Sequence, residues 1–317
     1  MADYKGIKGF KVQSLASDPT LVEGQVWYNT AGFALKYLGV AAGAWASSTA
    51  LNTARMYMAA SSSGSVTSAL VIGGTPVAPT ELLNGSSWTE IVDPTAPRSK
   101  ASGIGTATAL VLAGGDAVSP PPAAVDTVEL WNGTAWSEVN DLNDTRYNMG
   151  EFGTSTAAVI AGGQSPGATN VCETWDGTCW TETNDLNTPA FELAGAGTSG
   201  TAGIMFGGRG VANTESWNGT SWTEVNNLNT GRADLGGSGS STAALGYGGA
   251  PSTGKTEEWD GTSWTEVADL GTGRYASQGI GSGTSEAMWA GGNVPPITAV
   301  VEEWNGVPLS VKTVTVS

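Results

Sequence analysis

Glutamates recur at two fixed positions of a repeat in this 317-residue sequence, and paired carboxylates can cleave glycosidic bonds. That reaction needs two carboxyl groups about 5 to 9 Å apart around a bound sugar. The first set is Glu81, Glu129, Glu173, Glu215, Glu257 and Glu302, and the second is Glu90, Glu138, Glu182, Glu224 and Glu266. Because the acids recur from unit to unit, we expect them to serve structure or solubility, and no acid pair stands apart as a catalytic site.

Arginine recurs in the same repeat. Five of the six arginines stand ten residues after a tryptophan, and Ala190 occupies that position in the remaining unit. The five are Arg55, Arg98, Arg146, Arg232 and Arg274. A partly buried carboxylate needs a charged or hydrogen-bonding partner. We therefore predict that these arginines bridge glutamates or backbone carbonyls between units, and we discount a ring of catalytic arginines.

Other residue types that commonly perform catalysis are missing. The sequence has no histidine, which removes the commonest general base, the usual triads and most zinc sites. The stretch GAGTSG at 195–200 matches the Gly-x-Gly-x-x-Gly motif of dinucleotide-binding proteins, but it leads into a predicted strand and not into a helix. Cys172 and Cys179 flank one hairpin turn without standing opposite each other, so we predict free thiols. We predict no catalytic residues, no cofactor and no metal site, with calcium binding left open.

The repeat itself predicts the fold. Its marker is Trp-Asn-Gly-Thr-Ser-Trp or a close variant, and the second tryptophan recurs every 42 to 48 residues, a period typical of propeller blades. Its positions are Trp45, Trp88, Trp136, Trp180, Trp222 and Trp264. Each unit also carries a Gly-Gly pair after an apolar run, and no segment shows a helical period. We predict an all-β fold, a six-bladed kelch-like β-propeller with four short strands in each blade.

The Asn-Gly or Asp-Gly pair between the two tryptophans predicts a hairpin. With a two-residue loop, Trp131 faces Thr134 and Glu129 faces Trp136, so both tryptophans lie on one face of the sheet. Packing that face against the next blade removes the indoles from water, at roughly 25 cal/mol per Å² of apolar area. We predict core packing for the tryptophans in preference to sugar binding.

The loops after the Gly-Gly pairs vary, whereas the tryptophan hairpins barely change. These loops and the connections between blades open on one face, and the hairpins open on the other. Binding residues often lie on variable loops above a rigid scaffold, although stiff connections without a partner are the open alternative. The predicted partner-binding residues are Pro76, Asp116, Pro121, Gln164, Arg209, Lys255 and Asn293. The lone acids Asp116, Asp126 and Asp234 are expected to be solvated loop residues.

Gly-Gly pairs and tryptophans at these positions resemble the kelch family of β-propellers over about residues 46–308. The resemblance implies radial blades closed into a ring between the chain ends. A half-unit stands at each end, and either the strand around Trp45 or the segment 308–317 completes the last blade. The predicted domains are an arm at 1–44, a propeller at 45–310 and a C-terminal strand or tail at 311–317.

The stretch GQVWYNTAGFALKYLG at 24–39 resembles a short β-hairpin of bacteriophage tail-fibre and other virion proteins. The tryptophan units are also similar to those in structural proteins of tailed phages from aquatic bacteria. The resemblance implies an N-terminal β-hairpin arm that docks on the particle, and a homo-oligomer or other symmetric set of copies. The residues assigned to virion attachment are Lys5, Lys8, Lys11, Trp27 and Tyr28.

We therefore expect a non-enzymatic virion protein of the tail or tail-fibre apparatus. Its loops would contact a host cell-surface glycan or protein, or neighbouring virion proteins. The net charge of −16 argues against nucleic acid as a partner. Without a signal-peptide core or a run of roughly 18 to 20 apolar residues, we expect synthesis in the host cytoplasm and no membrane insertion. A bacterial surface or secreted lectin-like propeller is the alternative, and a carbohydrate-cleaving enzyme ranks third.

Overall fold

The structure is a computed structural model that describes residues 13–17, 26–39, 43–76, 79–117, 123–306 and 310–313. The chain divides into two compact units. Ala44–Asn305 forms the larger one, and Met1–Gly43 together with Gly306–Ser317 forms the smaller one. Every regular element in the described ranges is a β-strand. Accordingly, the described part of the chain contains no helix that could span a membrane.

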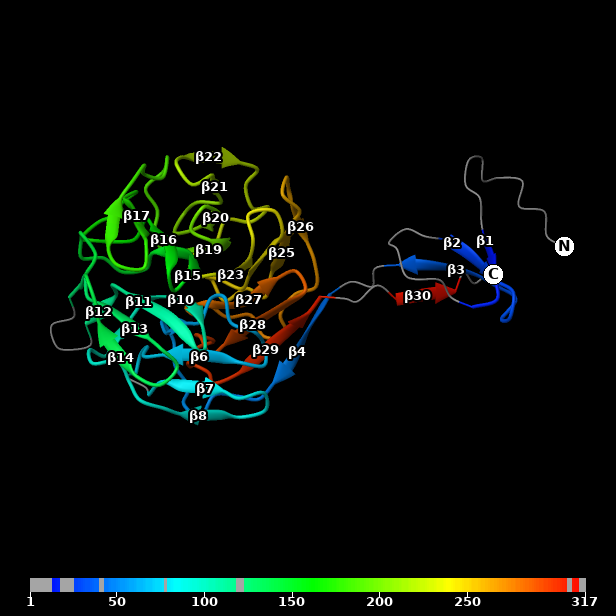
Figure 1. Cartoon of the computed structure of the whole chain (residues 1–317), viewed down its shortest axis with the longest axis horizontal. Helices are drawn as coiled ribbons and strands as arrows, with labels where there is room; N and C mark the ends of the chain where they lie inside the picture. Colours follow the sequence, from blue (N-terminus) through cyan, green and yellow to red (C-terminus); the bar gives the residue numbers. More distant parts are fainter. Residues whose placement is uncertain are drawn as a thin grey trace. The chain divides into compact units, whose positions relative to one another are not determined.

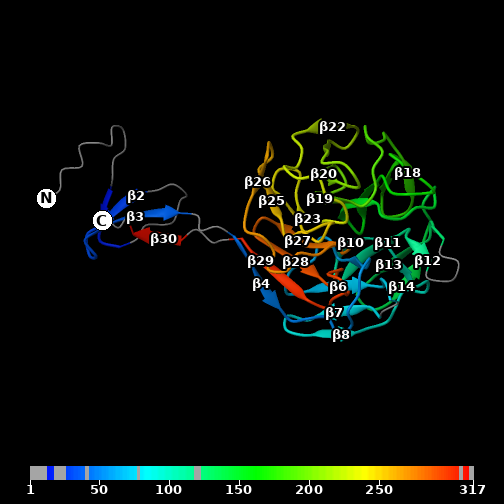
Figure 2. The ribbon, with the colours of Figure 1, turned by 180° about the vertical axis from the view of Figure 1, so that it is seen from behind.

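The larger unit arranges its described strands as six four-stranded antiparallel sheets around a ring (Figures 1 and 2). Blade 1 consists of β5 (Ala59–Ala60), β6 (Ala69–Ile72), β7 (Glu81–Leu83) and β8 (Trp88–Glu90). Blade 2 consists of β10 (Ser102–Thr106), β11 (Ala109–Ala113), β13 (Val128–Trp131) and β14 (Trp136–Glu138). Blade 3 consists of β15 (Gly150–Thr154), β16 (Ala157–Ala161), β17 (Cys172–Trp175) and β18 (Trp180–Glu182). Blade 4 consists of β19 (Leu193–Ser199), β20 (Ala202–Gly207), β21 (Thr214–Trp217) and β22 (Trp222–Val225). Blade 5 consists of β23 (Gly236–Gly239), β24 (Ala244–Tyr247), β25 (Thr256–Trp259) and β26 (Trp264–Glu266). Blade 6 consists of β27 (Gly279–Gly283), β28 (Glu286–Ala290), β29 (Val301–Asn305) and β4 (Ala44–Ser48). The short strands β9 (Arg98–Ser99) and β12 (Asp116–Ala117) pair with each other beside blade 2.

The strand around Trp45 completes the last blade. β4 pairs antiparallel with β29, and Trp45 lies opposite Trp304. The C-terminal strand β30 (Ser310–Thr313) instead belongs to the smaller unit, in a sheet of order β1-β2-β3-β30 with β1 (Gln13–Leu15), β2 (Val26–Asn29) and β3 (Ala34–Gly39). The first of the two alternatives for closing the ring is therefore the one that the chain adopts, and the predicted 311–317 strand is grouped with the arm.

The predicted register of the tryptophan hairpins was wrong. Trp131 pairs with Trp136, not with Thr134, so the turn contains four residues instead of two. The reason is local: the side-chain oxygen of Asn132 accepts the backbone N–H groups of Thr134 and Ala135, each at 2.9 Å. A side-chain acceptor of this kind stabilises a longer turn. The shift is an even number of residues, so both tryptophans still share one face.

Indole rings fill the space between neighbouring blades, as predicted. Trp175 and Trp180 of blade 3 pack with Ile104 and Val111 of blade 2 in one buried cluster, and their ring centroids are 5.3 Å apart. No member of the following group is more than 6% exposed: Trp88, Trp131, Trp175, Trp180, Trp217, Trp222, Trp259, Trp264 and Trp304. Five blades present a pair of tryptophans to the preceding blade and blade 1 presents Leu83 and Trp88, so the repeat spacing of tryptophan follows from the ring geometry.

The Gly-Gly pairs fit each blade against the next one. A Cβ on Gly73, which has φ of +60°, would lie 2.3 Å from the carbonyl oxygen of Arg98. The N–H of Gly74 donates to that same oxygen at 3.2 Å. The first position needs glycine because the Arg98 carbonyl oxygen approaches it closely, and the second because its backbone is left-handed. Through these contacts the pair joins the end of one blade to the start of the following blade.

Both cysteines are free thiols, as predicted. Thr174 pairs with Thr181 rather than with Cys179, because the turn has four residues. Cys179 therefore lies exposed in the turn, whereas Cys172 is buried in β17. Burial raises the pKa of the Cys172 thiol to about 12, which makes it unreactive at neutral pH.

Candidate functional site

Six residues, one from each blade, form a closed ring of backbone hydrogen bonds on the face where the variable loops open. Each N–H donates to the carbonyl oxygen of the equivalent residue in the preceding blade, at 2.7–3.1 Å. All six have φ between 52° and 64° although none is glycine, a conformation that L-residues adopt only when the surroundings impose it. We name this set the axial ring: Tyr57, Lys100, Asn148, Glu192, Asp234 and Ala276.

The axial ring surrounds a small polar cavity, the axial pocket, of about 60 Å³. Its lining comes from all six blades and includes the ring side chains together with Glu151, Ser277 and Gln278. The cavity has room for a few water molecules, whereas sites for drug-sized ligands occupy roughly 300–1,000 Å³. A large ligand would therefore contact the mouth of the pocket and the loops around it.

Glu151 lines the axial pocket and is 9% exposed. Its carboxyl oxygens accept hydrogen bonds from Ser102 Oγ at 3.1 Å and Gln278 Nε2 at 2.6 Å. The Gln278 side-chain oxygen also accepts hydrogen bonds from the backbone N–H groups of Ala60 and Gly103, at 2.6 and 3.2 Å. Side chains and backbone of four blades thus meet at the axis.

Burial controls the protonation of two acids in the axial pocket. Burial raises the pKa of Glu151 to about 8, against a smaller lowering by its bonds with Ser102 and Gln278. Burial, and then the Glu192 charge, raise the pKa of Asp234 to about 7, while Lys100 and Arg209 oppose the change. Asp234 was expected to be a solvated loop residue; it is instead half-buried in the axial ring, because its backbone completes the hydrogen-bonded circle.

Replacing Glu151 by glutamine should reduce the pH dependence of stability, and the part due to Asp234 should remain. The folded state keeps the Glu151 proton up to about pH 8, whereas the unfolded chain releases it near pH 4.5. The free energy of unfolding of the native protein should therefore fall as pH rises through this interval. Urea unfolding measured across the interval tests this. Glu182→Gln, at an exposed position of β18, should leave the slope unchanged, and equal slopes for Glu151→Gln and the native protein would contradict the assignment.

Several predicted binding residues connect directly to the axial ring. Arg209 lies 3.8 Å from Glu192 and 5.7 Å above the Phe191 ring. Lys100 lies 3.4 Å from Asp116. The loops after the Gly-Gly pairs thus begin at the rim of the axial pocket.

The remaining predicted loop residues lie on the same face. Gln164 and Asn293 exchange backbone hydrogen bonds with Tyr147 and Tyr275, the neighbours of two axial-ring residues. Pro76 is exposed at the start of its loop. Pro121 lies outside the described residues. The structure therefore places all the described members on one face, and their role as partner-binding residues stays a prediction.

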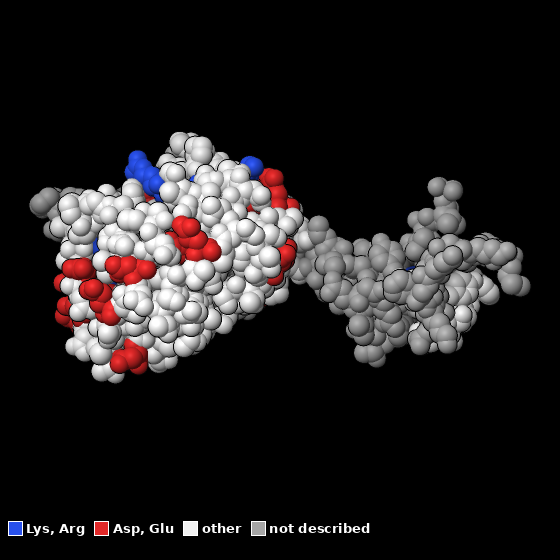
Figure 3. Space-filling model, turned by 90° about the horizontal axis from the view of Figure 1, so that it is seen from above, with Lys and Arg blue, Asp and Glu red and all other residues white. Residues whose placement is uncertain are grey.

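Positive charge on the ring gathers on this face. The other basic residues of Ala44–Asn305 are buried arginines, and the three basic side chains with more exposure are those of Lys100, Arg209 and Lys255, at 24%, 69% and 38%. In the edge-on view of Figure 3 the prominent basic side chains lie along the upper edge of the ring, and acidic side chains spread over its side. The loop face is therefore chemically distinct from the rest of the ring.

Sequence reasoning missed the axial ring. Its members share an offset, two residues after the repeated arginine or its alanine replacement, but six different amino acids occupy it. What these residues share is their backbone conformation and not their side chain. No residue type therefore recurs at this position of the repeat. Counting a constant offset from the tryptophans was the one signal that the sequence offered.

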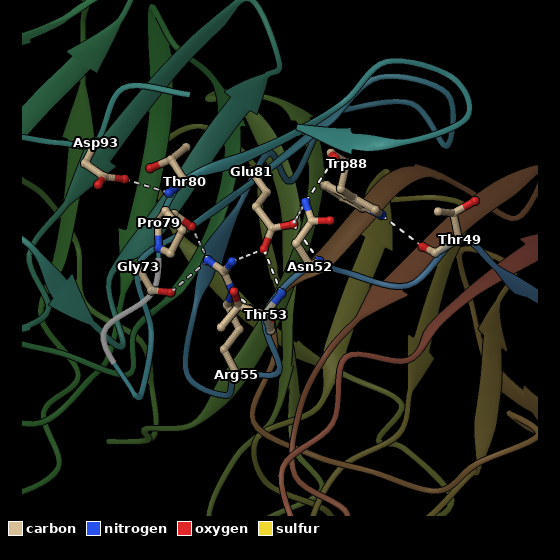
Figure 4. A network of polar contacts seen from close by, with 10 residues as sticks. All are labelled: Thr49, Asn52, Thr53, Arg55, Gly73, Pro79, Thr80, Glu81, Trp88 and Asp93. Carbon is tan, nitrogen blue, oxygen red and sulfur yellow. Dashed lines mark hydrogen bonds and ion pairs between the residues drawn. The ribbon is translucent and has the colours of Figure 1, made fainter. Parts of the chain in front are cut away.

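The repeated arginines and glutamates form buried ion pairs, as predicted, but each side-chain pair lies within one blade and does not bridge two blades as expected. The pairs are Arg55–Glu81, Arg98–Glu129, Arg146–Glu173, Arg232–Glu257 and Arg274–Glu302. Figure 4 shows the first of them: Arg55 binds Glu81 and the carbonyl oxygens of Pro79 and Gly73, while the backbone and amide of Asn52 donate to Glu81 at 2.8 Å. Each arginine enters a blade from the preceding connection, so its backbone connects two blades while its side chain anchors one.

The second set of glutamates is exposed. Glu129 pairs with Glu138, not with Trp136 as the two-residue turn implied. Glu129 is buried with Arg98 at 3.2 Å, whereas Glu138 points to solvent. The two sets therefore do not form the enclosed pair of carboxyl groups that glycoside cleavage needs.

In the smaller unit, Trp27 is fully buried and Tyr28 half-buried. Both lie on β2, where Trp27 pairs with Lys36 and Tyr28 with Leu35 of β3. Lys5, Lys8 and Lys11 lie outside the described residues. Burial indicates that Trp27 stabilises the hairpin, and its assignment to virion attachment stays a prediction.

The fold defines the chain as a β-propeller. A solved structure similar to it is that of YjhT, also a β-propeller, with a TM-score of 0.67 over 84% of this chain and 99% of that chain at 11% identity. No protein-family model and no curated protein matches the sequence. Within the described residues, no group of three or more acidic or cysteine side chains is placed to hold a metal ion.

Proposed function

We propose that this β-propeller is a non-enzymatic binding protein of a bacteriophage tail or tail fibre. The observation that supports binding is the loop face, where the axial pocket, the varied loops, the exposed Arg209 and the partly exposed Lys100 and Lys255 occur together. Rigid blades hold this face in place. The expected ligand is a host cell-surface glycan or protein, or a neighbouring virion protein.

The smaller unit would attach the protein to the particle. Both chain ends contribute to it, through β1 to β3 and β30, and its β2–β3 hairpin carries the resemblance to virion proteins. The proposal therefore assigns attachment and recognition to different units. Several copies arranged with the symmetry of the tail would give multivalent binding.

Binding without cleavage is favoured by the size of the axial pocket. At about 60 Å³ it does not accommodate a sugar ring together with a leaving group. Glu151 has an elevated pKa, as a general acid needs, but its carboxyl group is buried and bonded to Ser102 and Gln278, and the second cavity that it lines measures only about 120 Å³. A glycan would rest on the rim, where Arg209 and the loops offer donors and a flat aromatic neighbour.

The attachment part is tested by immunogold microscopy of purified phage particles with an antibody against the propeller. Label on the tail or fibres is the expected result. Label absent from particles, with retained polysaccharide binding, would replace the proposal by the lectin-like alternative.

The recognition part is tested by binding to purified bacterial capsular polysaccharides and lipopolysaccharides. The double variant Arg209→Ala and Lys255→Ala should weaken binding about a hundredfold or more, on the scale of two lost charged hydrogen bonds. Thr220→Ala, in an exposed hairpin turn on the opposite face, is the matched control and should bind normally. Equal weakening in both variants would remove the loop face as the binding site, and release of reducing ends would show an enzyme.

A further inference from the structure

Five blades fill the same buried site with their own guanidinium group. In blade 3, Arg146 donates to the carbonyl oxygens of Gly162 and Val171 at 3.3 and 2.6 Å, and to Glu173 at 2.5 Å. One planar group thus satisfies a carboxylate and two carbonyls. This planar arrangement of acceptors matches the several N–H donors of a guanidinium group, whereas an ammonium group is a compact point charge.

Blade 4 keeps the backbone of this site without the arginine. The N–H of Gly163 donates to the Ala190 carbonyl at 2.8 Å, as Gly115 donates to Arg146 at 2.9 Å. The N–H of Ala190 donates to Thr169 at 3.2 Å, matching an equivalent bond of Arg146 at 3.3 Å. Residue 190 therefore occupies the arginine position, and its side chain alone differs.

The acceptors of the missing guanidinium are also in place. Glu215 is the equivalent of Glu173 and is 3% exposed. It accepts the N–H and side-chain amide of Asn187, each at 2.8 Å, and the N–H of Thr188 at 3.0 Å. Among the described residues it has no ion-pair partner, whereas each equivalent glutamate of the other blades has an arginine. A buried carboxylate without a cation favours binding of one.

A cavity stands where the arginine side chain would be. Its volume is about 20 Å³, and its lining includes Ala190, Glu215, Gly207 and Asn213. Gly207 and Asn213 are the repeat equivalents of the two residues whose carbonyls bind Arg146. Ala190 is partly exposed, so the cavity is reached from solvent. It is too small for a sugar, and the polar groups that line it are the equivalents of those that hold the guanidinium group in blade 3.

We propose that this cavity is a binding site for a guanidinium group supplied by another molecule, which pairs with Glu215 and the carbonyl oxygens of Gly207 and Asn213. The group could come from a small guanidinium compound or from an arginine side chain of a partner polypeptide. The chemistry at the site is the same in both cases. The proposal does not depend on the loop-face function, because the ligand and the contacted residues are different.

The test compares thermal unfolding with and without ethylguanidinium in the native protein and in Ala190→Arg, which fills the site internally. Subtracting the response of Ala190→Arg removes the general denaturing action of guanidinium compounds. The native protein should show a differential rise in Tm of about 2–4 °C near saturation, with no such rise for ethylammonium. Ala190→Met, which fills the cavity without a cation, should also lose the response.

Arg146→Ala provides a positive control, because it should open an equivalent cavity in blade 3 and add a second, similar response. The source of the ligand is distinguished by titrating the native protein with the peptide Gly-Arg-Gly and with its citrulline analogue. Binding of the arginine peptide alone identifies a partner side chain, and a response to ethylguanidinium alone identifies a small molecule. Equal responses in the native protein, Ala190→Arg and Ala190→Met would overturn the proposal and leave the loop-face function untouched.

Discussion

Replacing Arg146 by methionine should lower the free energy of unfolding by about 3–5 kcal/mol, the usual cost of breaking a buried ion pair from one side. Glu173 is fully buried and would keep only the bonds from Asn143. Its charge would be neither paired nor hydrated. Urea unfolding monitored by tryptophan fluorescence measures the loss.

The double variant Arg146→Met with Glu173→Gln serves as the control. Removing both charges should recover much of the stability, because the penalty comes from the unpaired carboxylate and not from the lost attraction. A loss below about 1 kcal/mol in the single variant would mean that Glu173 is hydrated or protonated once Arg146 is absent, and the role assigned to the ion pair would be wrong.

Replacing Trp217 by alanine should cost a similar amount, about 3–5 kcal/mol. Trp217 is 1% exposed and packs with Phe152 and Val159 of the preceding blade. The cavity left behind would separate two rigid sheets that cannot close over it. Its indole Nε1 also donates to the carbonyl oxygen of Gly200 at 3.1 Å, so that acceptor would lose a partner.

Trp136→Ala is the matched control, since Trp136 occupies a tryptophan position of the same repeat but is only half-buried. Its cost should be clearly smaller. If both substitutions cost the same in denaturant unfolding, burial between blades would not be what stabilises the ring.

The sequence was sufficient to predict elements that repeat by residue type. Tryptophan at a period of 42 to 48 residues predicted the blades and the face on which Trp175 and Trp180 pack. The constant offset of arginine predicted its ion pairs, including the gap at Ala190. In each case the side chain makes the same contacts in successive blades. The same residue type is therefore required at the equivalent position of each repeat, and the sequence shows it.

Features set by the backbone escaped prediction. The hairpin turn was expected to have two residues because Asn-Gly favours that length, but the Asn132 side chain stabilises four. The axial ring requires a left-handed backbone at Asp234 and its equivalents, and nothing in their side chains reports this. Ring closure stayed ambiguous because both the strand around Trp45 and the segment 308–317 have a strand-like sequence, and only the pairing of β4 with β29 distinguishes them.

The pairing of β4 with β29 has a consequence for biosynthesis. β4 leaves the ribosome before any complete blade exists, and its partner β29 follows only after the other five blades. Early folding can stack sheets in order, but a nascent chain has an unpaired strand edge until β29 has been translated, and such edges invite association with other chains. Products truncated shortly before Val301 should therefore aggregate, even though five complete blades are present.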